Sequence, residues 1–372
     1  MTPIQILQKY WKHDFFKTPQ EEIITAVLNK QDTLALLPTG GGKSVCFQIP
    51  ALLTEGICLV ISPLTALMKD QVTQLQNKGI KALVLTGGIS ITETADLLDN
   101  CEHGNYKFLY LSPERLQNEW VLERIKNLKI NLIAIDEAHC VSQWGHDFRP
   151  AYLKISVLKT YFTKTPFIAL TATATQRVQE DIIVQLQMQN CTLYTKSFER
   201  KNLAYMVYKV ENKMQLVEQI LRKNPQPSII YVRNRKSCLE TVKQLTALGF
   251  SATFYHGGLS VKDKNKQMEL WMDDKLQVMV ATNAFGMGID KPNVKTVIHI
   301  NLPENLENYY QEAGRAGRNG EKSFAVMLTN ATDLQLVNNQ FLNNLIDTNF
   351  LLLIYKKLNN YFQIALNEGA DE

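Results

Sequence analysis

The stretch LALLPTGGGKS, residues 34–44, runs from an apolar segment into a turn with three consecutive glycines, followed by Lys43 and Ser44. The apolar segment predicts a buried strand, and we expect a helix to begin near Ser44. Glycines let the backbone of such a turn approach phosphate groups, and the helix start adds the positive end of its dipole. The stretch therefore predicts a phosphate-binding loop in an α/β fold.

The two residues that end this loop have separate expected roles. We expect Lys43 to reach the β and γ phosphates of a nucleoside triphosphate, and the Ser44 hydroxyl to hold Mg²⁺. The general pattern G-x-x-x-x-G-K-[ST] requires glycine at position 37, where this chain has leucine, so the loop fits instead the variant found in helicases. The residues expected to contact the nucleotide here are Thr39, Gly40, Gly41, Gly42, Lys43 and Ser44.

A pair of acidic residues follows the apolar run 132–135, where the sequence reads DEAH. Acidic residues at the carboxyl end of a buried strand lie beside the phosphate loop in this kind of fold. Asp136 suits the Mg²⁺ role, and Glu137 suits the orientation and deprotonation of an attacking water. A solvated acidic turn is the alternative, and the phosphate loop upstream argues against it.

The length and the apolar runs indicate two domains. A single core rarely exceeds about 250–300 residues, and this chain has 372, of which 45% are apolar and 20% charged. Runs rich in Val, Ile and Leu predict strands that are buried on both faces of a parallel sheet. The runs fall into two sets, residues 33–37, 57–62, 108–111, 132–135 and 167–171, and then residues 228–232, 252–255, 278–282, 297–300 and 324–328.

We therefore predict an α/β protein with two tandem domains, each a mostly parallel sheet flanked by helices. The segment 197–203 has no clear periodicity and is the expected joint, which gives a first domain of residues 1–203 and a second of 204–342. Residues 343–372 carry apolar residues at helical spacing from Phe350 onwards. This tail is expected to pack on the core or to begin a further module.

Charge and cysteine content restrict the class further. The net charge of +4 is only a weak indication of a nucleic-acid ligand. The six cysteines are scattered with no C-x-x-C pair, so we expect neither disulfides nor a zinc site. The N-terminus lacks the pattern of a signal peptide, and no apolar run approaches the roughly 20 residues of a membrane span. We expect a cytoplasmic protein without membrane contact.

Several longer motifs resemble one family closely. The segment DEAHCVSQWGHDFRP (residues 136–150) and the segment YYQEAGRAGRNG (309–320) resemble the RecQ family of DNA helicases nearly residue for residue. The other matching motifs, in the order of the family, are PTGGGKS (38–44), SPLTALMKDQV (62–72), SPERL (112–116), LTATAT (170–175), YHGGL (255–259) and ATNAFGMGIDKPNV (281–294).

The resemblance implies more than the spacing of residues can. It implies two RecA-like domains with ATP and Mg²⁺ in the cleft between them. It also implies 3′ to 5′ movement on single-stranded DNA, unwinding of forked duplexes, and a chromosome-associated role in DNA repair and recombination. Members of the family generally add a zinc-binding and a winged-helix domain. No cysteine follows Cys238, so we expect that zinc site to be absent here, and a monomer is the default expectation.

The resemblance also assigns further nucleotide contacts. Gln20 resembles the adenine-reading glutamine of the family, and Lys17 stands where the family usually has arginine, so it supplies a cation without a planar stacking group. Arg318 resembles an arginine that reaches across the cleft to the transferred phosphoryl group. The other implied contacts in the second domain are Gly286, Asp290, Gln311 and Arg315.

An aromatic-rich loop follows the acidic motif and is expected to couple DNA to hydrolysis, as in the RecQ family. Its rings can stack on unpaired bases, at about 1–3 kcal/mol per base; the alternative is that Trp144 and Phe148 are core anchors. The expected loop residues are Gln143, Trp144, His146, Phe148 and Arg149. Expected contacts to the DNA backbone are Ser62, Pro63, Leu64, Arg233, Asn234, His256, Thr282 and Asn283. Lys69 is a further candidate, for which a solvated surface position is the alternative.

Other functions remain open from the sequence. The first alternative is a DNA-dependent ATPase or translocase that unwinds little in this short form. The second is an RNA helicase of the same superfamily, against which the segment 136–150 argues. The third is a nucleic-acid-binding module with an inactive ATPase. The presence of Lys43, Ser44, Asp136, Glu137 and Arg318 argues against the third.

Overall fold

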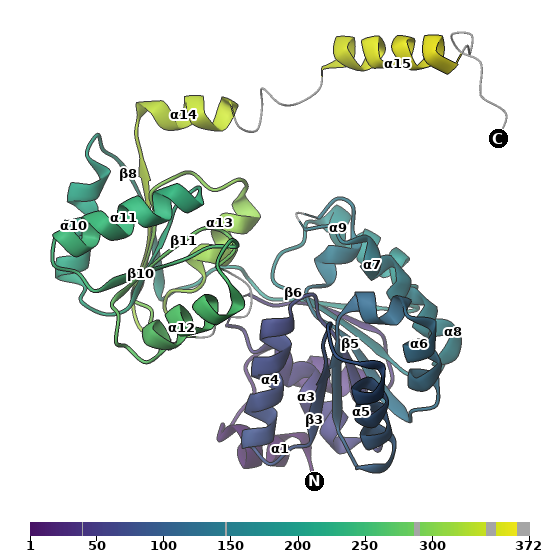
Figure 1. Ribbon diagram of the computed structural model, residues 1–372. Helices are drawn as coiled ribbons and strands as arrows, with labels where there is room; N and C mark the ends of the chain where they lie inside the picture. Colours follow the sequence, from purple (N-terminus) through teal and green to yellow (C-terminus); the bar gives the residue numbers. More distant parts are fainter. Residues whose placement is uncertain (39, 146, 286–290, 340–346, 363–372) are drawn as a thin grey trace.

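The computed structural model describes residues 1–38, 40–145, 147–285, 291–339 and 347–362. Two α/β units lie side by side, with the N-terminal unit in purple to teal and the second in green (Figure 1). Each unit has its own parallel sheet with helices on both faces. The predicted fold class is confirmed.

The first sheet has the strand order β3-β4-β2-β5-β6-β1-β7, and each pair of neighbouring strands in it is parallel. Its strands are β1 (Thr33–Leu36), β2 (Ile57–Ile61), β3 (Ala82–Leu85), β4 (Phe108–Leu111), β5 (Ile130–Ile135), β6 (Phe167–Thr171) and β7 (Thr192–Thr195). The helices are α1 (Pro3–Trp11), α2 (Gln20–Leu28), α3 (Lys43–Leu53), α4 (Thr65–Asn77), α5 (Ile91–His103), α6 (Glu119–Lys126), α7 (Pro150–Leu153), α8 (Val157–Tyr161) and α9 (Gln176–Gln185), with short 3-10 helices η1 (Pro113–Gln117), η2 (Ala138–Val141) and η3 (Lys154–Ser156).

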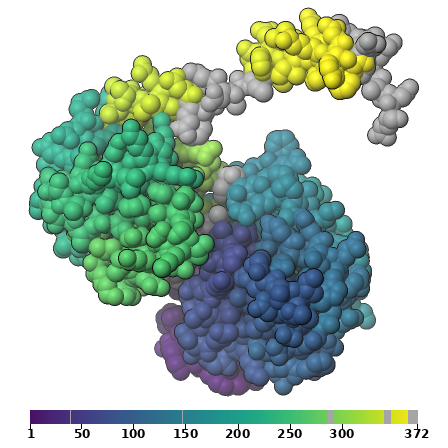
Figure 2. All heavy atoms as spheres, in the orientation of Figure 1, coloured from purple at the N-terminus to yellow at the C-terminus, as the bar shows by residue number. Residues whose placement is uncertain are grey.

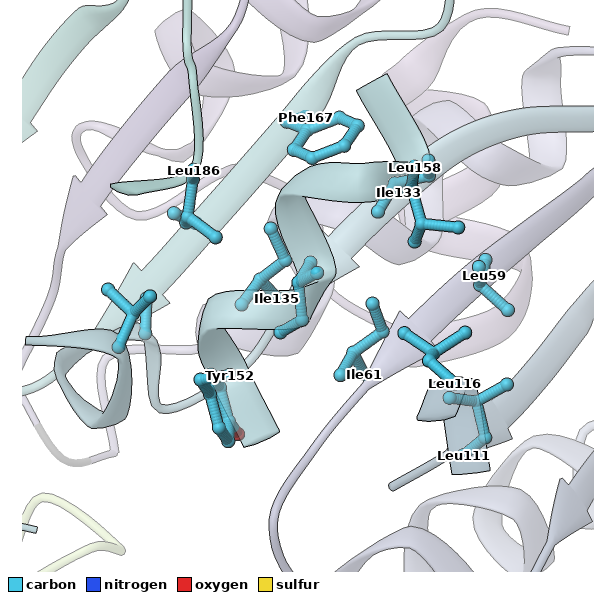
Figure 3. Packing of buried hydrophobic residues seen from close by; sticks show 14 of the residues in the cluster. Leu59, Ile61, Leu111, Leu116, Ile133, Ile135, Tyr152, Leu158, Phe167 and Leu186 are labelled. Atoms are coloured by element: carbon cyan, nitrogen blue, oxygen red, sulfur yellow. The ribbon is translucent and has the colours of Figure 1, made fainter. Parts of the chain in front are cut away.

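Alternating side chains of the strands divide between two cores. In β5, Ile133 and Ile135 face a core that includes residues of α5 to α9. Figure 3 shows both isoleucines in this core together with Tyr152 of α7 and Leu158 of α8. Leu132 and Ala134 face the opposite core, which includes α2, α3 and α4. Because both faces are covered, the central strands consist of apolar residues without a polar alternation.

The second sheet has the order β10-β11-β9-β12-β13-β8, again with parallel pairs. Its strands are β8 (Leu203–Lys209), β9 (Ser228–Tyr231), β10 (Ala252–Tyr255), β11 (Val278–Ala281), β12 (Thr296–His299) and β13 (Ser323–Thr329). Its helices are α10 (Lys213–Lys223), α11 (Arg235–Ala247), α12 (Val261–Met272), α13 (Leu306–Ala313) and α14 (Ala331–Val337). Residues of α12 and α13 belong to one core and residues of α10 and α11 to the other.

The tail forms the predicted helix, α15 (Thr348–Phe362), which is drawn in yellow and apart from both sheets (Figures 1 and 2). Its apolar residues from Phe350 to Phe362 are largely exposed. None of the described helices combines the length and the apolar character that crossing a membrane requires. The six cysteines are free thiols, buried except for the half-buried Cys191.

Candidate functional site

The phosphate loop lies between β1 and α3, at the carboxyl edge of the first sheet. Gly40 and Gly42 both have φ +76°, a left-handed conformation that side chains disfavour. A Cβ on Gly42 would overlap Nε2 of Gln20, and one on Gly41 would lie 2.8 Å from the Pro38 carbonyl oxygen. Conformation therefore favours glycine at positions 40 and 42, and packing against the backbone favours it at position 41. Thr39, also expected here, lies outside the described residues.

Gln20 opens α2 and contacts the phosphate loop directly. Its Nε2 donates to the carbonyl oxygens of Gly41 and Gly42, at 3.3 and 3.2 Å. Its Oε1 accepts a hydrogen bond from the backbone N–H of Lys17, at 2.9 Å. In this structure Gln20 therefore links the segment before α2 to the glycine turn, while the Lys17 side chain is exposed.

The acidic motif follows β5, beside the phosphate loop. Asp136 is 7% exposed, and Nζ of Lys43 lies 3.8 Å from Oε1 of Glu137. Burial raises the pKa of Asp136 to about 6, and the neighbouring Glu137 carboxylate adds to the rise, whereas Lys43 opposes it. Two carboxylates thus face one ammonium group, an arrangement that favours a further cation. Glu137 has φ +48°, a conformation uncommon for a residue with a side chain.

A chain of polar contacts leads from Glu137 to the second domain. Nδ1 of His139 lies 3.5 Å from Oε2 of Glu137 and 2.9 Å from Oγ1 of Thr171. The Thr171 hydroxyl donates to the carbonyl oxygen of Thr173, at 3.0 Å. Nε2 of Gln311 in turn donates to the Thr173 hydroxyl oxygen, at 3.3 Å. The carboxylate of Glu137 is therefore connected to the half-buried Gln311 of α13 through three buried residues of the first domain.

The second domain contributes two arginines to the same cleft. Arg315 is 5% exposed, and its Nε and Nη1 have no hydrogen-bond partner among the described residues. A buried cation with unpaired donors is costly unless an anion completes it. Cγ of Arg318 lies 3.7 Å from the position that a Cβ on Gly40 would occupy. The sequence-predicted Gly286 and Asp290 lie outside the described residues.

One cleft between the domains brings most of the predicted nucleotide residues together. Space-filling atoms show the two domains in contact along a recess (Figure 2). The cleft is lined by Gly40, Gly42, Lys43, Ser44, Leu67, Asp70, Gln71, Gln74, Asp136, Glu137, Ala172, Gln311, Arg315 and Arg318.

Sequence reasoning missed the contribution of α4 to this cleft. Leu67, Asp70, Gln71 and Gln74 follow the spacing i, i+3, i+4 and i+7, which places them on one helix face. That spacing was a usable signal. The face could not be assigned to the nucleotide cleft before the helix was placed beside the phosphate loop.

The aromatic-rich loop leaves its tryptophan at the surface. The Trp144 side chain is 58% exposed, so it is not a core anchor, and its backbone N–H donates to Oγ of Ser142 at 3.2 Å. Phe148 is half-buried, Gln143 is exposed, and His146 lies outside the described residues. Nη1 of Arg149 donates to the carbonyl oxygen of Pro63 at 3.2 Å. This bond ties the end of the loop to the segment after β2.

The remaining predicted DNA contacts follow strands at the carboxyl edges of both sheets. Ser62, Pro63 and Leu64 follow β2, and the residues of the second domain follow β9, β10 and β11. Some of them are buried. Ser62 is 2% exposed with no hydrogen-bond partner for its hydroxyl among the described residues, and His256 and Thr282 are 8% and 6% exposed. The half-buried or exposed members are Leu64, Lys69, Arg233, Asn234 and Asn283.

Two of these residues are held by local hydrogen bonds. The backbone N–H of Arg233 donates to Oδ1 of Asn301 at 3.0 Å. Oδ1 of Asn234 accepts from the backbone N–H of Ser237 at 2.8 Å and so caps α11. The first bond holds the backbone of Arg233, and the second holds the side chain of Asn234 at the start of α11.

Family models match most of the chain. The model described as DEAD/DEAH box helicase matches residues 17–182, and the model described as helicase conserved C-terminal domain matches residues 212–320. The first match covers the phosphate loop and the acidic motif, and the second covers Gln311, Arg315 and Arg318.

Curated relatives and solved structures agree with these matches. The ATP-dependent DNA helicase RecQ of Bacillus subtilis is 44% identical over 335 residues, covering 89% of this chain and 56% of the relative. A probable ATP-dependent DNA helicase RecS of the same species is 41% identical over 341 residues, covering 89% of this chain and 68% of the relative. The chain thus spans little more than half the length of the RecQ relative.

Among solved structures, Mycobacterium smegmatis helicase Lhr, bound to single-stranded DNA and AMP-PNP, aligns with a TM-score of 0.71 and 19% identity, covering 88% of this chain and 48% of that chain. This likeness concerns the fold alone. The family models, the identity of the curated relatives and the residues that line the interdomain cleft agree, and the chain belongs to the RecQ family of ATP-dependent DNA helicases.

Proposed function

We propose that this chain is the motor of an ATP-dependent DNA helicase, which couples ATP hydrolysis to 3′ to 5′ movement on single-stranded DNA and to duplex unwinding. The observation that carries the proposal is the shared cleft, in which Lys43 and Glu137 of the first domain face Arg315 and Arg318 of the second. A triphosphate in such a cleft contacts both domains, so its hydrolysis changes the attraction between them.

The residues of the cleft suit hydrolysis of a triphosphate. The glycine turn, Lys43 and the unpaired donors of Arg315 bind phosphate oxygens. Ser44 and Asp136 would hold Mg²⁺, which neutralises charge on the phosphates; the excess of carboxylate over ammonium charge fits a divalent cation. Glu137 orients and deprotonates the attacking water, and Arg318 stabilises the charge that develops on the transferred group.

The contact chain from Glu137 to Gln311 offers a physical route for coupling. It passes through His139, Thr171 and Thr173, all of which are buried. A change in the distance between the domains alters the Gln311–Thr173 contact, and this changes the hydrogen bonding of His139 beside Glu137. Nucleotide state and domain closure therefore influence each other through named groups.

Single-stranded and forked DNA are the proposed ligands, with the carboxyl edges of both sheets as the contact surface. The exposed Trp144 ring stacks on an unpaired base, and short polar side chains with backbone N–H groups contact phosphates without reading sequence. The solved Lhr structure is described as bound to single-stranded DNA and AMP-PNP. We propose further that the protein acts as a monomer on chromosomal DNA, in repair and recombination.

An unwinding assay distinguishes the motor from a translocase that unwinds little. The substrates are a forked duplex, a duplex with only a 3′ tail and a duplex with only a 5′ tail. The proposal expects ATP-dependent strand separation on the fork and the 3′-tailed duplex. DNA-stimulated hydrolysis with no strand separation would favour the translocase, and unwinding from the 5′ tail alone would overturn the direction.

Replacing Trp144 with alanine is expected to lower the stimulation of ATP hydrolysis by single-stranded DNA about tenfold, while the rate without DNA changes by less than about twofold. The reason is that the exposed ring lies in the loop that follows the acidic motif but does not line the nucleotide cleft. Steady-state rates with and without oligo-dT measure this ratio. Trp120→Ala, another partly exposed tryptophan in α6, is the matched control. An unchanged stimulation ratio would refute the coupling role of Trp144.

A further inference from the structure

The Trp144 ring is covered by a side chain from another element. Cζ of Arg177 lies over this ring, 3.3 Å from its centroid. Arg177 is an exposed residue in the first turn of α9. Although the guanidinium covers the ring, Trp144 remains 58% exposed. The guanidinium and a further planar ligand can therefore use the two faces of the same ring.

The backbone of α9 around Arg177 is anchored in the hydrophobic core. The next residue, Val178, is 3% exposed and belongs to the same core cluster as Val141, which ends the 3-10 helix η2. Ile182 anchors the following turn of α9 in that cluster, and α9 packs against η2. The Trp144 loop begins directly after η2, so Trp144 and Arg177 both extend from elements that pack in the same core.

We infer that Arg177 is a positioning residue of the DNA interface, which backs the Trp144 ring and holds it ready for an unpaired base to stack on its other face. A planar guanidinium stacks well on an indole, and the attraction between them adds to the packing. An exposed tryptophan on a loop otherwise loses side-chain freedom when a base binds. Fixing the ring beforehand removes part of that cost. This inference rests on the proposed function, because it takes single-stranded DNA as the ligand.

The position of α9 also connects this contact to hydrolysis. The helix begins shortly after Thr173, whose hydroxyl accepts the hydrogen bond from Gln311. The loop on the other side of the contact begins shortly after His139, which bonds to Thr171. The Trp144–Arg177 contact thus joins the segment that follows His139 to the segment that follows Thr173. Both residues belong to the chain of polar contacts between Glu137 and the second domain. A base on Trp144 can influence both segments at once.

A double-mutant cycle tests the inference. The affinity for fluorescein-labelled oligo-dT is measured by anisotropy for the wild type, Arg177→Ala, Trp144→Ala and the double variant. We expect Arg177→Ala to weaken binding about threefold to fivefold in the wild-type background, and by less than about 1.5-fold when Trp144 is already alanine. Arg177→Lys, which keeps the charge without the plane, is expected to recover part of the loss.

A spectroscopic readout and a matched control accompany the cycle. Stacking on Trp144 quenches the fluorescence of 2-aminopurine placed in the oligonucleotide, and Arg177→Ala is expected to reduce the quenching at saturating protein. The control is Arg124→Ala, because Arg124 lies over another exposed ring, that of Trp120, with Cζ 5.9 Å from its centroid. This variant is expected to bind oligo-dT like the wild type.

The outcomes separate this inference from the proposed function. Equal losses from Arg177→Ala in both backgrounds would overturn the inference, since the arginine would then bind DNA independently of the ring, while the motor function would stand. No loss in the wild-type background would overturn it as well. If Trp144→Ala itself leaves oligo-dT affinity unchanged, the proposed stacking contact fails, and the inference fails with it.

Discussion

Lys43→Ala is expected to lower DNA-stimulated ATP hydrolysis at least about a hundredfold, because a single preorganised charge in a phosphate site is worth that much in the transition state. Lys43 is the first residue of α3, and its Nζ lies 3.8 Å from Oε1 of Glu137. Alanine removes the cation that offsets the two neighbouring carboxylates. The phosphate oxygens of a bound triphosphate then contact only the glycine turn and the arginines of the second domain. Hydrolysis is measured as phosphate release with oligo-dT present.

The fold is expected to survive this change. Lys43 is partly exposed and belongs to no hydrophobic cluster, so the thermal midpoint followed by circular dichroism should stay near that of the wild type. Lys129→Ala is the matched control. Lys129 pairs with Glu55 at an exposed site away from the cleft residues, and its loss should leave hydrolysis unchanged. Normal turnover by folded Lys43→Ala would remove the basis for placing the triphosphate here.

Arg318→Ala is expected to reduce the maximal hydrolysis rate about a hundredfold or more, with little change in affinity for single-stranded DNA. Arg318 comes from the second domain and lies against Gly40 of the phosphate loop. An arginine in that position stabilises charge that develops only during phosphoryl transfer, so its removal affects the rate more than the binding of ATP. The rate at saturating ATP and the ATP dissociation constant are measured separately.

Two variants make this experiment specific. Arg318→Lys keeps a positive charge but not the planar fork, and we expect an intermediate rate. Arg222→Ala removes an exposed arginine of α10 that pairs with Glu218, and it should not alter hydrolysis. If Arg318→Ala turns over within about twofold of the wild type, the second domain supplies no essential charge from this residue, and the proposed role of Arg318 in phosphoryl transfer is wrong.

The central strands were predictable because they are covered on both faces. Continuous apolar runs at β5 and β11 could be recognised as strands from the sequence, with ends that differ from the structure by one or two residues. The edge strands β3, β7 and β8 were missed. β7 alternates half-buried and exposed residues and has no unbroken apolar run. β3 and β8 are largely apolar in sequence, but their residues are only partly buried because each strand lies at an edge of its sheet.

The site was predictable where its chemistry is local in sequence. Lys43 and Glu137 stand in short motifs with fixed neighbours, and the structure brings both to one cleft. The Gln311–Thr173 hydrogen bond and the packing of Arg177 on Trp144 depend on how separate segments meet in space. The sequence pattern of one segment does not specify which residue of another segment it will contact. The buried positions of Ser62 and Thr282 likewise became evident only with the fold.

The most direct test of the motor is the steady-state ATPase rate of the wild-type chain with no nucleic acid, with oligo-dT, and with an RNA of equal length. We expect oligo-dT to raise the rate at least about tenfold, a usual size for coupling between two sites, and RNA to raise it far less. A rate that is the same with and without oligo-dT would contradict the coupling of the cleft to DNA.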